Sequence, residues 1–446
     1  MRTKITFYEF DGFELDEGII SDRIEQTGLT AEEIRYLDWF SQKHSSKNSP
    51  VFQITPSTIR ARQFVGTICI GSKEIQVLPK LLKGKDEEGG QLLQNLISML
   101  EYVNQLEGID SGMHKLAQHT GSFIEIYIRA FAGRLLRLIQ RNTPRSYVTS
   151  SGSLDFVKGR ILFSENIKVN ATNQAKVFCE YDEFIEDNIF NQTFKYVAES
   201  LSKITSVSDT KKALVRSVSL LSDVKLRSVS FQEVRNVSVP DRSRELSETF
   251  ALAKMFLRYL SSDIYGGSAK SVAVLIDMNE LFESFVFNIL NRNSEQLKIN
   301  KVTFQRGRRL VSGVRELGNT EFESRSMFNT FQDILLDFST GRRLVIDTKY
   351  KLVGSNGQPH FGISGDDVYQ ILAYREISGS QDNESSVSLF YPENKERMRL
   401  EFKINSENDV RFSAATLNIG FNMQGNVMPL VEEMRGIFES LGVYKV

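Results

Sequence analysis

The sequence predicts a multidomain protein of the α+β or α/β class. It comprises a β-rich N-terminal domain over residues 1–90, a mainly helical middle region over 91–265, and a C-terminal domain over 266–446 with a mixed central sheet flanked by helices. Apolar and polar residues alternate in the first part, as in half-buried strands. Apolar residues recur at helical spacing in the middle part. In the last part, short apolar runs alternate with helical segments, which is typical of a sheet covered by helices.

Strands and one helix are expected in the N-terminal domain. Thr30 is expected to cap a helix over residues 31–43, because Glu33 follows three positions later and completes a capping-box pattern. Residues 67–77 predict two strands around a Gly-Ser-Lys turn. The polar stretch 84–90 contains glycines and marks the predicted boundary of the domain.

Helical periodicity dominates the middle region. Tyr147–Gly159 is rich in turn-forming residues and predicts a connector between helices. Gly266, Gly267 and Ser268 predict a loop at the start of the C-terminal domain. The expected helices cover residues 91–141 with a break near 107–114, and residues 187–204, 209–221 and 242–260.

Composition excludes several classes of protein. The formal net charge of −1 does not favour general binding of polyanions. Cys69 and Cys179 lie far apart and lack zinc-ligand spacing, which predicts reduced, packed thiols. No apolar run could span a membrane and no signal core begins the chain, so we expect a cytoplasmic protein without a membrane partner. Without a G-x-x-x-x-G-K-[ST] motif, the chain is expected to bind no nucleotide itself.

A pair of strands near residues 332–351 carries the most informative chemistry. Asp333 stands at the start of the first strand, and the second strand ends in Asp347, Thr348 and Lys349. Because side chains alternate along a strand, Asp347 and Lys349 share a face, and a hairpin can bring Asp333 to the same edge. The apolar run before Asp347 indicates a buried strand. Charges at the end of such a strand are costly unless they are paired or metal-bound.

Two carboxylates and an ammonium at one edge suit a divalent cation and a phosphodiester. Mg²⁺ (or Mn²⁺) prefers oxygen ligands and retains waters, so one or two carboxylates plus a substrate phosphate suffice. A bound metal ion lowers the pKa of a water molecule and polarises the phosphoryl group. We therefore expect Asp333 and Asp347 to be metal ligands, and Lys349 to orient water or stabilise charge. A solvated hairpin edge is the alternative.

Three further residues extend this set. Glu283 lies in a predicted amphipathic helix and is a candidate third metal ligand. Gln370 and Tyr374 are four apart in a predicted helix, so they share a face. The candidate catalytic residues are thus Glu283, Asp333, Asp347, Lys349, Gln370 and Tyr374.

Because the net charge is near zero, double-stranded DNA, if it is the substrate, is expected to be held by a local basic patch, unless a partner supplies the affinity. One candidate patch comprises Arg306, Arg308 and Arg309. The other comprises Arg342 and Arg343 beside the catalytic strands. A solvated strand end is the alternative interpretation of the first patch.

Short motifs are spread along the chain from about Val65 onward. They are Val65–Ile68, Val77–Lys80, Gly159–Arg160, Glu180–Glu183, Ile276–Asn279, Leu281–Glu283, Gln332–Leu336, Ile346–Lys351, Tyr369–Tyr374 and Leu389–Pro392. Together they resemble the PD-(D/E)xK nuclease superfamily and, within it, the McrC family, the nuclease subunit of modification-dependent McrBC restriction systems. In one departure from the superfamily motif, Gln332 rather than proline precedes Asp333. That position mainly shapes the entry into the strand.

This resemblance implies a C-terminal PD-(D/E)xK endonuclease core. It implies a subunit of a GTP-dependent, modification-dependent (5-methylcytosine-type) restriction complex that cuts DNA with Mg²⁺. It also implies that the N-terminal β-rich part docks on a McrB-like AAA+ GTPase ring and stimulates that GTPase. Arg60, Arg62 and Lys80 are candidates for the stimulating residues.

Two other interpretations remain open at the level of sequence. The chain could be a non-catalytic adaptor that activates a AAA+ ring, or a RecB-like nuclease in another DNA-defence system, where Q-x-x-x-Y also occurs. The intact set of Asp333, Asp347 and Lys349 favours catalysis over the adaptor. The absence of helicase motifs and cysteine clusters argues against the RecB-like system.

Overall fold

The computed structural model divides the chain into two compact units. The first comprises Met1–Lys4, Thr67–Glu74 and Ser122–Val274, and the second comprises Ile5–Gly66, Ile75–Gly121 and Leu275–Val446. The predicted three-part division at residues 90 and 265 rests on sequence pattern and stays a prediction. The structure describes all residues except 1–2, 15–27, 46–49, 56–57, 72, 81–89, 104–121, 240–242, 260–271, 319, 355–357, 378–384, 394–395, 406–410, 421–422, 424–425 and 445–446.

Among its described residues, the N-terminal region contains the predicted mixture of strands and helix. Helix α2 (Ala31–Lys43) begins at a capping box, in which Thr30 Oγ1 accepts from the Glu33 N–H and the Glu33 carboxylate accepts from the Thr30 N–H. This confirms the predicted cap. The strands form the sheets β2-β4-β3 and β1-β6-β5-β10; they are β1 (Thr3–Tyr8), β2 (Gly12–Glu14), β3 (Phe52–Ile54), β4 (Thr58–Ala61), β5 (Phe64–Ile70), β6 (Lys73–Leu78) and β10 (Val272–Asp277).

Helices form the core of the first unit, as the apolar spacing predicted. Phe131 of α5 packs against Phe256 of α10, and Phe190 of α7 packs against Phe250 of α10, in edge-on ring contacts. The helices are α5 (Phe123–Arg141), α7 (Ile189–Ser202), α8 (Ser208–Leu220), α9 (Phe231–Val234) and α10 (Arg244–Tyr259). The predicted break near 107–114 and the predicted loop at 266–268 lie outside the described residues.

A small sheet replaces much of the connector that was predicted at Tyr147–Gly159. That prediction was wrong, because Ser146–Leu154 forms strand β7, which pairs along its whole length with β9 (Val177–Ile185). The serine and glycine content resembles that of a turn, but pairing with a strand more than 20 residues away supplies the backbone hydrogen bonds. The sheet order is β7-β9-β8, with β8 at Arg160–Ile161 and helix α6 at Phe163–Val169.

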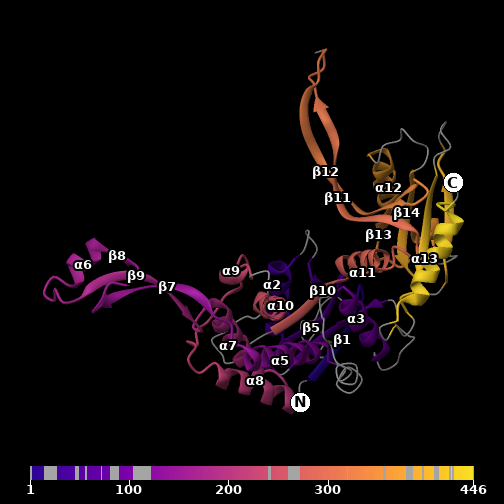
Figure 1. Ribbon diagram of the computed structural model, residues 1–446. Coiled ribbons are helices and arrows are strands. Elements are labelled where there is room, and N and C mark those ends of the chain that lie inside the picture. Colours follow the sequence, from indigo (N-terminus) through magenta and orange to yellow (C-terminus); the bar gives the residue numbers. More distant parts are fainter. Residues whose placement is uncertain are drawn as a thin grey trace. The chain divides into compact units, whose positions relative to one another are not determined.

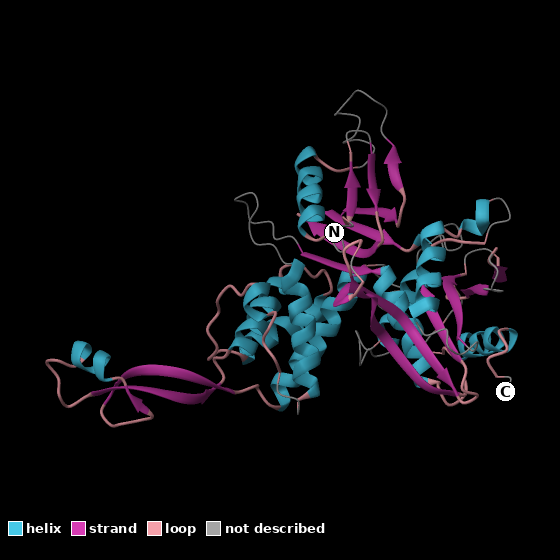
Figure 2. Cartoon of the chain, turned by 90° about the horizontal axis from the view of Figure 1, so that it is seen from above, coloured by secondary structure: helices cyan, strands magenta, loops and turns pink. Residues whose placement is uncertain are grey.

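This small sheet projects from the helices of its own unit (Figure 1; Figure 2). Its surface is unusual, because large apolar side chains stand exposed on it rather than packing inward. They are Tyr147, Phe156, Val157, Phe163, Ile167, Val169 and Phe184. An exposed apolar surface of this kind is typical of an interaction site.

The second unit is built on a six-stranded mixed sheet with the order β11-β12-β13-β14-β16-β15. Strands β11, β12 and β13 are antiparallel, β13, β14 and β16 are parallel, and β15 is antiparallel to β16. The mixed α/β architecture with several sheets confirms the predicted fold class. The strands are β11 (Ile299–Val314), β12 (Glu323–Phe338), β13 (Arg343–Thr348), β14 (Ser385–Pro392), β15 (Arg399–Lys403) and β16 (Arg411–Leu417).

Helices cover this sheet because each carries an apolar stripe. Phe282 of α11 (Met278–Arg292) packs beside Tyr350, which follows β13. Ile371 and Tyr374 of α12 (Gly365–Ile377) belong to a buried cluster with Leu335 and Val345 of the sheet. The remaining helical elements of this unit are α3 (Gly90–Tyr102), the 3₁₀ helix η2 (Pro359–Gly362) and α13 (Met428–Ser440).

Two predictions from composition can be compared with the structure. Cys69 and Cys179 are both buried and carry free thiols, as predicted. Within the part of the chain that the structure describes, no helix is both long enough and apolar enough to cross a membrane.

Candidate active site

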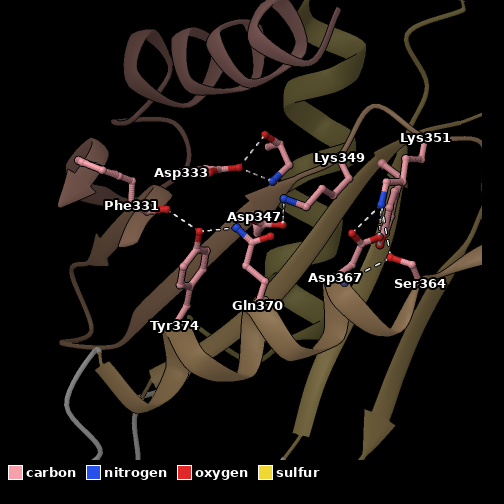
Figure 3. Close-up of polar contacts among 11 residues, drawn as sticks. Phe331, Asp333, Asp347, Lys349, Lys351, Ser364, Asp367, Gln370 and Tyr374 are labelled. Carbon is pink, nitrogen blue, oxygen red and sulfur yellow. Dashed lines mark hydrogen bonds and ion pairs between the residues drawn. The ribbon is translucent and has the colours of Figure 1, made fainter. Parts of the chain in front are cut away.

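The hairpin of β12 and β13 brings the predicted acids together. Asp333 comes just before the β12 residues that pair with β13, and Asp347 stands near the end of β13. Asp333 Oδ2 accepts from the Thr348 N–H at 2.9 Å and from Thr348 Oγ1 at 3.2 Å. Figure 3 shows Asp333, Asp347 and Lys349 directed toward one another. The geometry expected from strand alternation is therefore present.

Asp347 and Lys349 form a buried ion pair. Lys349 Nζ lies 2.7 Å from Asp347 Oδ2, and the Asp347 side chain is fully buried. Burial raises the pKa of the Asp347 carboxyl to about 7, with the Asp333 charge adding to the rise and Lys349 opposing it. Burial acts to lower the pKa of Lys349, but the charges of Asp347 and Asp333 outweigh it and hold that pKa above its usual value.

The predicted Q-x-x-x-Y pair ties helix α12 to strand β12. Gln370 Nε2 donates to Tyr374 Oη at 2.6 Å, and Tyr374 Oη donates to the Phe331 carbonyl (Figure 3). Gln332 Nε2 donates to the Tyr374 carbonyl at 3.1 Å. Burial, followed by the charges of the two aspartates, raises the pKa of Tyr374, so its hydroxyl stays a donor. The pair therefore fixes the strand two residues before Asp333.

Asp367 is a neighbour that sequence reasoning did not select. Lys351 Nζ lies 2.7 Å from Asp367 Oδ1, and Tyr391 Oη donates to Asp367 Oδ2 at 3.1 Å. Asp367 is buried, and its charge contributes to the raised pKa of Asp347. In the sequence Asp367 looks like an ordinary acid in the first turn of a helix. The one sequence feature that pointed toward it was Lys351, because strand alternation places this lysine on the same face as Lys349.

Glu283 lies apart from these contacts. It stands on α11, and its carboxylate accepts from Gln305 Nε2 at 3.1 Å. Gln305 has a positive φ of 45°, which is rare for a residue with a side chain, and in the β11–β12 register it lies opposite Asp333. The charges that act on Asp347 are those of Asp333, Lys349 and Asp367. The role of Glu283 as a third ligand stays a prediction.

The predicted basic patches differ in their surroundings. Arg309 is exposed on β11, and Arg306 is half-buried there. Arg343 Nε donates to Asp337 Oδ1 at 2.9 Å, so this guanidinium is already paired within the hairpin. Arg309 of the first patch is therefore exposed, whereas Arg343 of the second patch is already paired.

The residues present fit a metal ion held largely by water and phosphate. Neither buried carboxylate oxygen of Asp347 has a well-aligned hydrogen bond, although Lys349 neutralises the charge. Oxygens in that state are suited to a hard cation. Among the described residues, no three His, Cys, Asp or Glu side chains are grouped to hold a metal ion. Asp333 and Asp347 would thus supply the acidic ligands, which suffices for Mg²⁺.

Fold and site together define a mixed-sheet α/β protein with a carboxylate–lysine cluster at the end of a buried strand. Residues 59–392 match the family model described as "McrBC 5-methylcytosine restriction system component", and the chain belongs to that family. No curated protein matches the chain.

Two solved structures are similar to this chain, both from Thermococcus gammatolerans. One is the refined half-complex of a tetradecameric assembly of McrB AAA+ hexamers with bound McrC. It is 20% identical, covers 98% of this chain and 100% of the matched chain, and has a TM-score of 0.66. The other is a McrBC complex that is 24% identical, covers 66% of this chain and 88% of the matched chain, and has a TM-score of 0.44. At 20% identity, the similarity to the half-complex structure indicates a shared fold.

Proposed function

We propose that this chain is the DNA endonuclease subunit of a GTP-dependent restriction complex that acts on 5-methylcytosine-containing DNA. The observation that carries the proposal is the buried pair of Asp347 and Lys349 beside Asp333, in a member of the McrBC family. Such a cluster suits metal-assisted cleavage of a phosphodiester.

Each residue has a distinct part in the proposed reaction. Asp333 and Asp347 would hold a Mg²⁺ ion, which when bound would supply an activated water and neutralise charge. Lys349 keeps Asp347 ionisable and directs its ammonium toward the attacking water or the developing charge. Gln370 and Tyr374 hold α12 against β12, so they position Asp333 rather than react.

We also propose that the chain docks on and stimulates a McrB-like AAA+ GTPase. The solved structure of similar fold has McrC bound to McrB AAA+ hexamers. The apolar side chains on the β7-β9-β8 sheet offer a docking surface, because they are large and exposed on an element that projects from its unit. The exposed apolar side chains favour this sheet as the docking element over the N-terminal β-rich part, where the family resemblance implied docking.

The docking surface can be tested by co-elution of this chain with a McrB-like AAA+ GTPase. Phe163→Ser together with Phe184→Ser is expected to lower co-elution and GTPase stimulation at least tenfold. Val215→Ser is the matched control, since Val215 is also half-exposed but lies on α8. Unchanged association of the double variant would remove the small sheet from the docking proposal.

Cleavage is tested with plasmid DNA containing 5-methylcytosine, the partner GTPase, GTP and Mg²⁺. Asp347→Asn is expected to abolish cleavage while leaving GTPase stimulation intact. Asp366→Asn is the control, because Asp366 is an exposed acid on α12. Full cleavage by the Asp347→Asn protein would reject the assignment. Stimulation by a wild-type chain that never cuts would support the non-catalytic adaptor instead.

A further inference from the structure

The β11–β12 hairpin extends well beyond the sheet that holds the site. Strand β12 pairs with β13 only over Ile334–Asp337, whereas it pairs with β11 as far as Glu323. Beyond Asp333, the two strands therefore continue as a two-stranded ribbon, which rises clear of β13 and β14 in Figure 1. The residues Arg306–Val314 give this ribbon a length of about 30 Å at 3.3 Å per residue.

One face of the ribbon begins next to Asp333. The Phe331 ring covers Gly307, where an added Cβ would lie 3.2 Å from a ring carbon. Phe331 is nevertheless 57% exposed. Arg309 and Asn329 are the next pair on that face by strand alternation, and both are exposed. With increasing distance from Asp333, the candidate metal ligand, this face therefore presents first the Phe331 ring and then the Arg309 guanidinium.

Two arginines on the ribbon shaft have no partner among the residues that the structure describes. Arg309 and Arg325 are exposed and form no ion pair or hydrogen bond with another described residue. Arg343, near the base, is by contrast paired with Asp337. The exposed acids of the hairpin gather near its turn, at Glu316, Glu321 and Glu323. Arg309 therefore lies on the half of the shaft nearer the site, whereas Arg325 lies nearer the turn.

We infer that this ribbon is a DNA-binding arm that lies along the duplex being cut, with Arg309 on a phosphate near the scissile bond. The inference rests on the proposed function and adds the element that holds the substrate. A two-stranded ribbon fits the major groove of B-DNA. Its length of about 30 Å corresponds to roughly nine base pairs at 3.4 Å per step.

The position of Arg309 on β11 determines how far its phosphate contact would lie from the candidate site at Asp333. Arg309 is four residues along β11 from Gln305, which lies opposite Asp333. That separation is about 13 Å along the strand, or roughly four base steps. Phosphate contacts fix the register of a protein on DNA without reading its sequence. The arm therefore holds and aligns the duplex at the site, and recognition of the modified base lies elsewhere.

The test is equilibrium binding of the full chain to a fluorescent 40-base-pair duplex, with Ca²⁺ in place of Mg²⁺, over a series of salt concentrations. Arg309→Ala with Arg325→Ala is expected to weaken binding roughly tenfold and to reduce the slope of log K against log salt by about 1.8. Restoring the charge with Arg309→Lys and Arg325→Lys is expected to restore most of the slope.

The matched control is Arg137→Ala with Arg216→Ala, two exposed arginines on α5 and α8 that form no ion pair with a described residue. This control is expected to leave affinity and slope unchanged. If the wild-type chain binds and cuts DNA but the ribbon variant keeps the wild-type slope, the arm is rejected and the proposed function stands.

Other outcomes separate the two proposals. Loss of self-association or of AAA+ binding by the ribbon variant, with DNA affinity intact, would make the ribbon a protein interface and overturn the inference. A wild-type chain that neither binds nor cuts DNA, even with its partner, would overturn the proposed function and this inference together.

Discussion

Lys349 Nζ lies 2.7 Å from Asp347 Oδ2, and both groups are largely removed from solvent. A carboxylate buried alone would stay protonated, whereas the adjacent ammonium makes ionisation accessible near neutral pH. This relationship links the charge state of the site to the pH and to any cation that binds there.

Metal binding is expected to release protons near neutral pH. Burial, with the Asp333 charge, raises the pKa of Asp347 to about 7, so below that pH a cation must displace a proton. Affinity for Mn²⁺ or Mg²⁺ should therefore increase as the pH rises from 6 to 8. Calorimetry in buffers of different ionisation enthalpy measures the protons released. Two results would contradict the assignment of Asp347 as a ligand. One is a metal affinity that does not change across this pH range, and the other is a pH dependence that persists in the Asp347→Asn protein.

Removing the ammonium is expected to shift this transition upward. In Lys349→Ala, the group that opposes the raised pKa of Asp347 is gone, so the pH midpoint of metal binding should rise. Cleavage should also fall by about 10²–10³-fold at pH 7.5, as for the loss of a charge-stabilising donor. Lys301→Ala is the control, since Lys301 is exposed on β11. A midpoint that moves downward would show that Lys349 does not act on Asp347.

Tyr374→Phe tests the link between α12 and β12. The hydroxyl joins Gln370 to the Phe331 carbonyl, so its loss leaves a partly buried carbonyl without that donor. We expect a loss of about 1–2 kcal/mol in stability and about a tenfold loss of cleavage, with metal affinity little changed. Tyr369→Phe is the control on the same helix, because its side chain is 72% exposed. Equal effects of the two substitutions would remove the positioning role from Tyr374.

Glu9 is expected to make the second unit less stable at alkaline pH. Burial raises its pKa from 4.5 to about 8, and the Asp277 charge adds to the rise. Below pH 4.5 the carboxyl is protonated in both folded and unfolded chains, and its contribution is fully present. As the pH rises to about 8, only the unfolded chain ionises readily, so stability is lost.

Replacing Glu9 with glutamine should remove this dependence. At pH 8.5 the Glu9→Gln protein is expected to be more stable by up to about 5 kcal/mol, at about 1.36 kcal/mol per pKa unit. Near pH 5 the two proteins should melt at similar temperatures. Thermal unfolding from pH 5 to 9 measures this, with exposed Glu32→Gln on α2 as the control. A parallel pH profile for wild type and Glu9→Gln would disprove the burial effect.

Much of the fold could be predicted from local patterns. The capping box at Thr30, the helices of the first unit and the hairpin between β12 and β13 follow from side-chain spacing and turn residues, which act over a few positions. Strand β7 could not be predicted in this way, because its serines and glycine resemble a turn and its partner β9 is distant in sequence.

The site residues likewise fall into two groups, those that local sequence predicts and those that depend on packing between distant elements. Asp347 and Lys349 could be predicted from their own strand, since alternation alone puts them on one face. Asp367 could not, because its pairing with Lys351 and Tyr391 depends on how α12 packs on the sheet. The contact of Glu283 with Gln305 likewise joins a helix and a strand, α11 and β11, and no sequence motif predicts it.

The sequence by itself determined the class of fold, the two aspartates and the lysine of the site, and the absence of a nucleotide-binding loop, because short-range periodicity and residue chemistry encode each of them. Only the tertiary structure decided how charged that site is and what surrounds it. Burial by α12 and the neighbouring strands changes the pKa of Asp347, and the long pairing of β11 with β12 carries Arg309 away from the sheet. Desolvation and long-range strand pairing depend on contacts between distant residues, which local sequence does not specify.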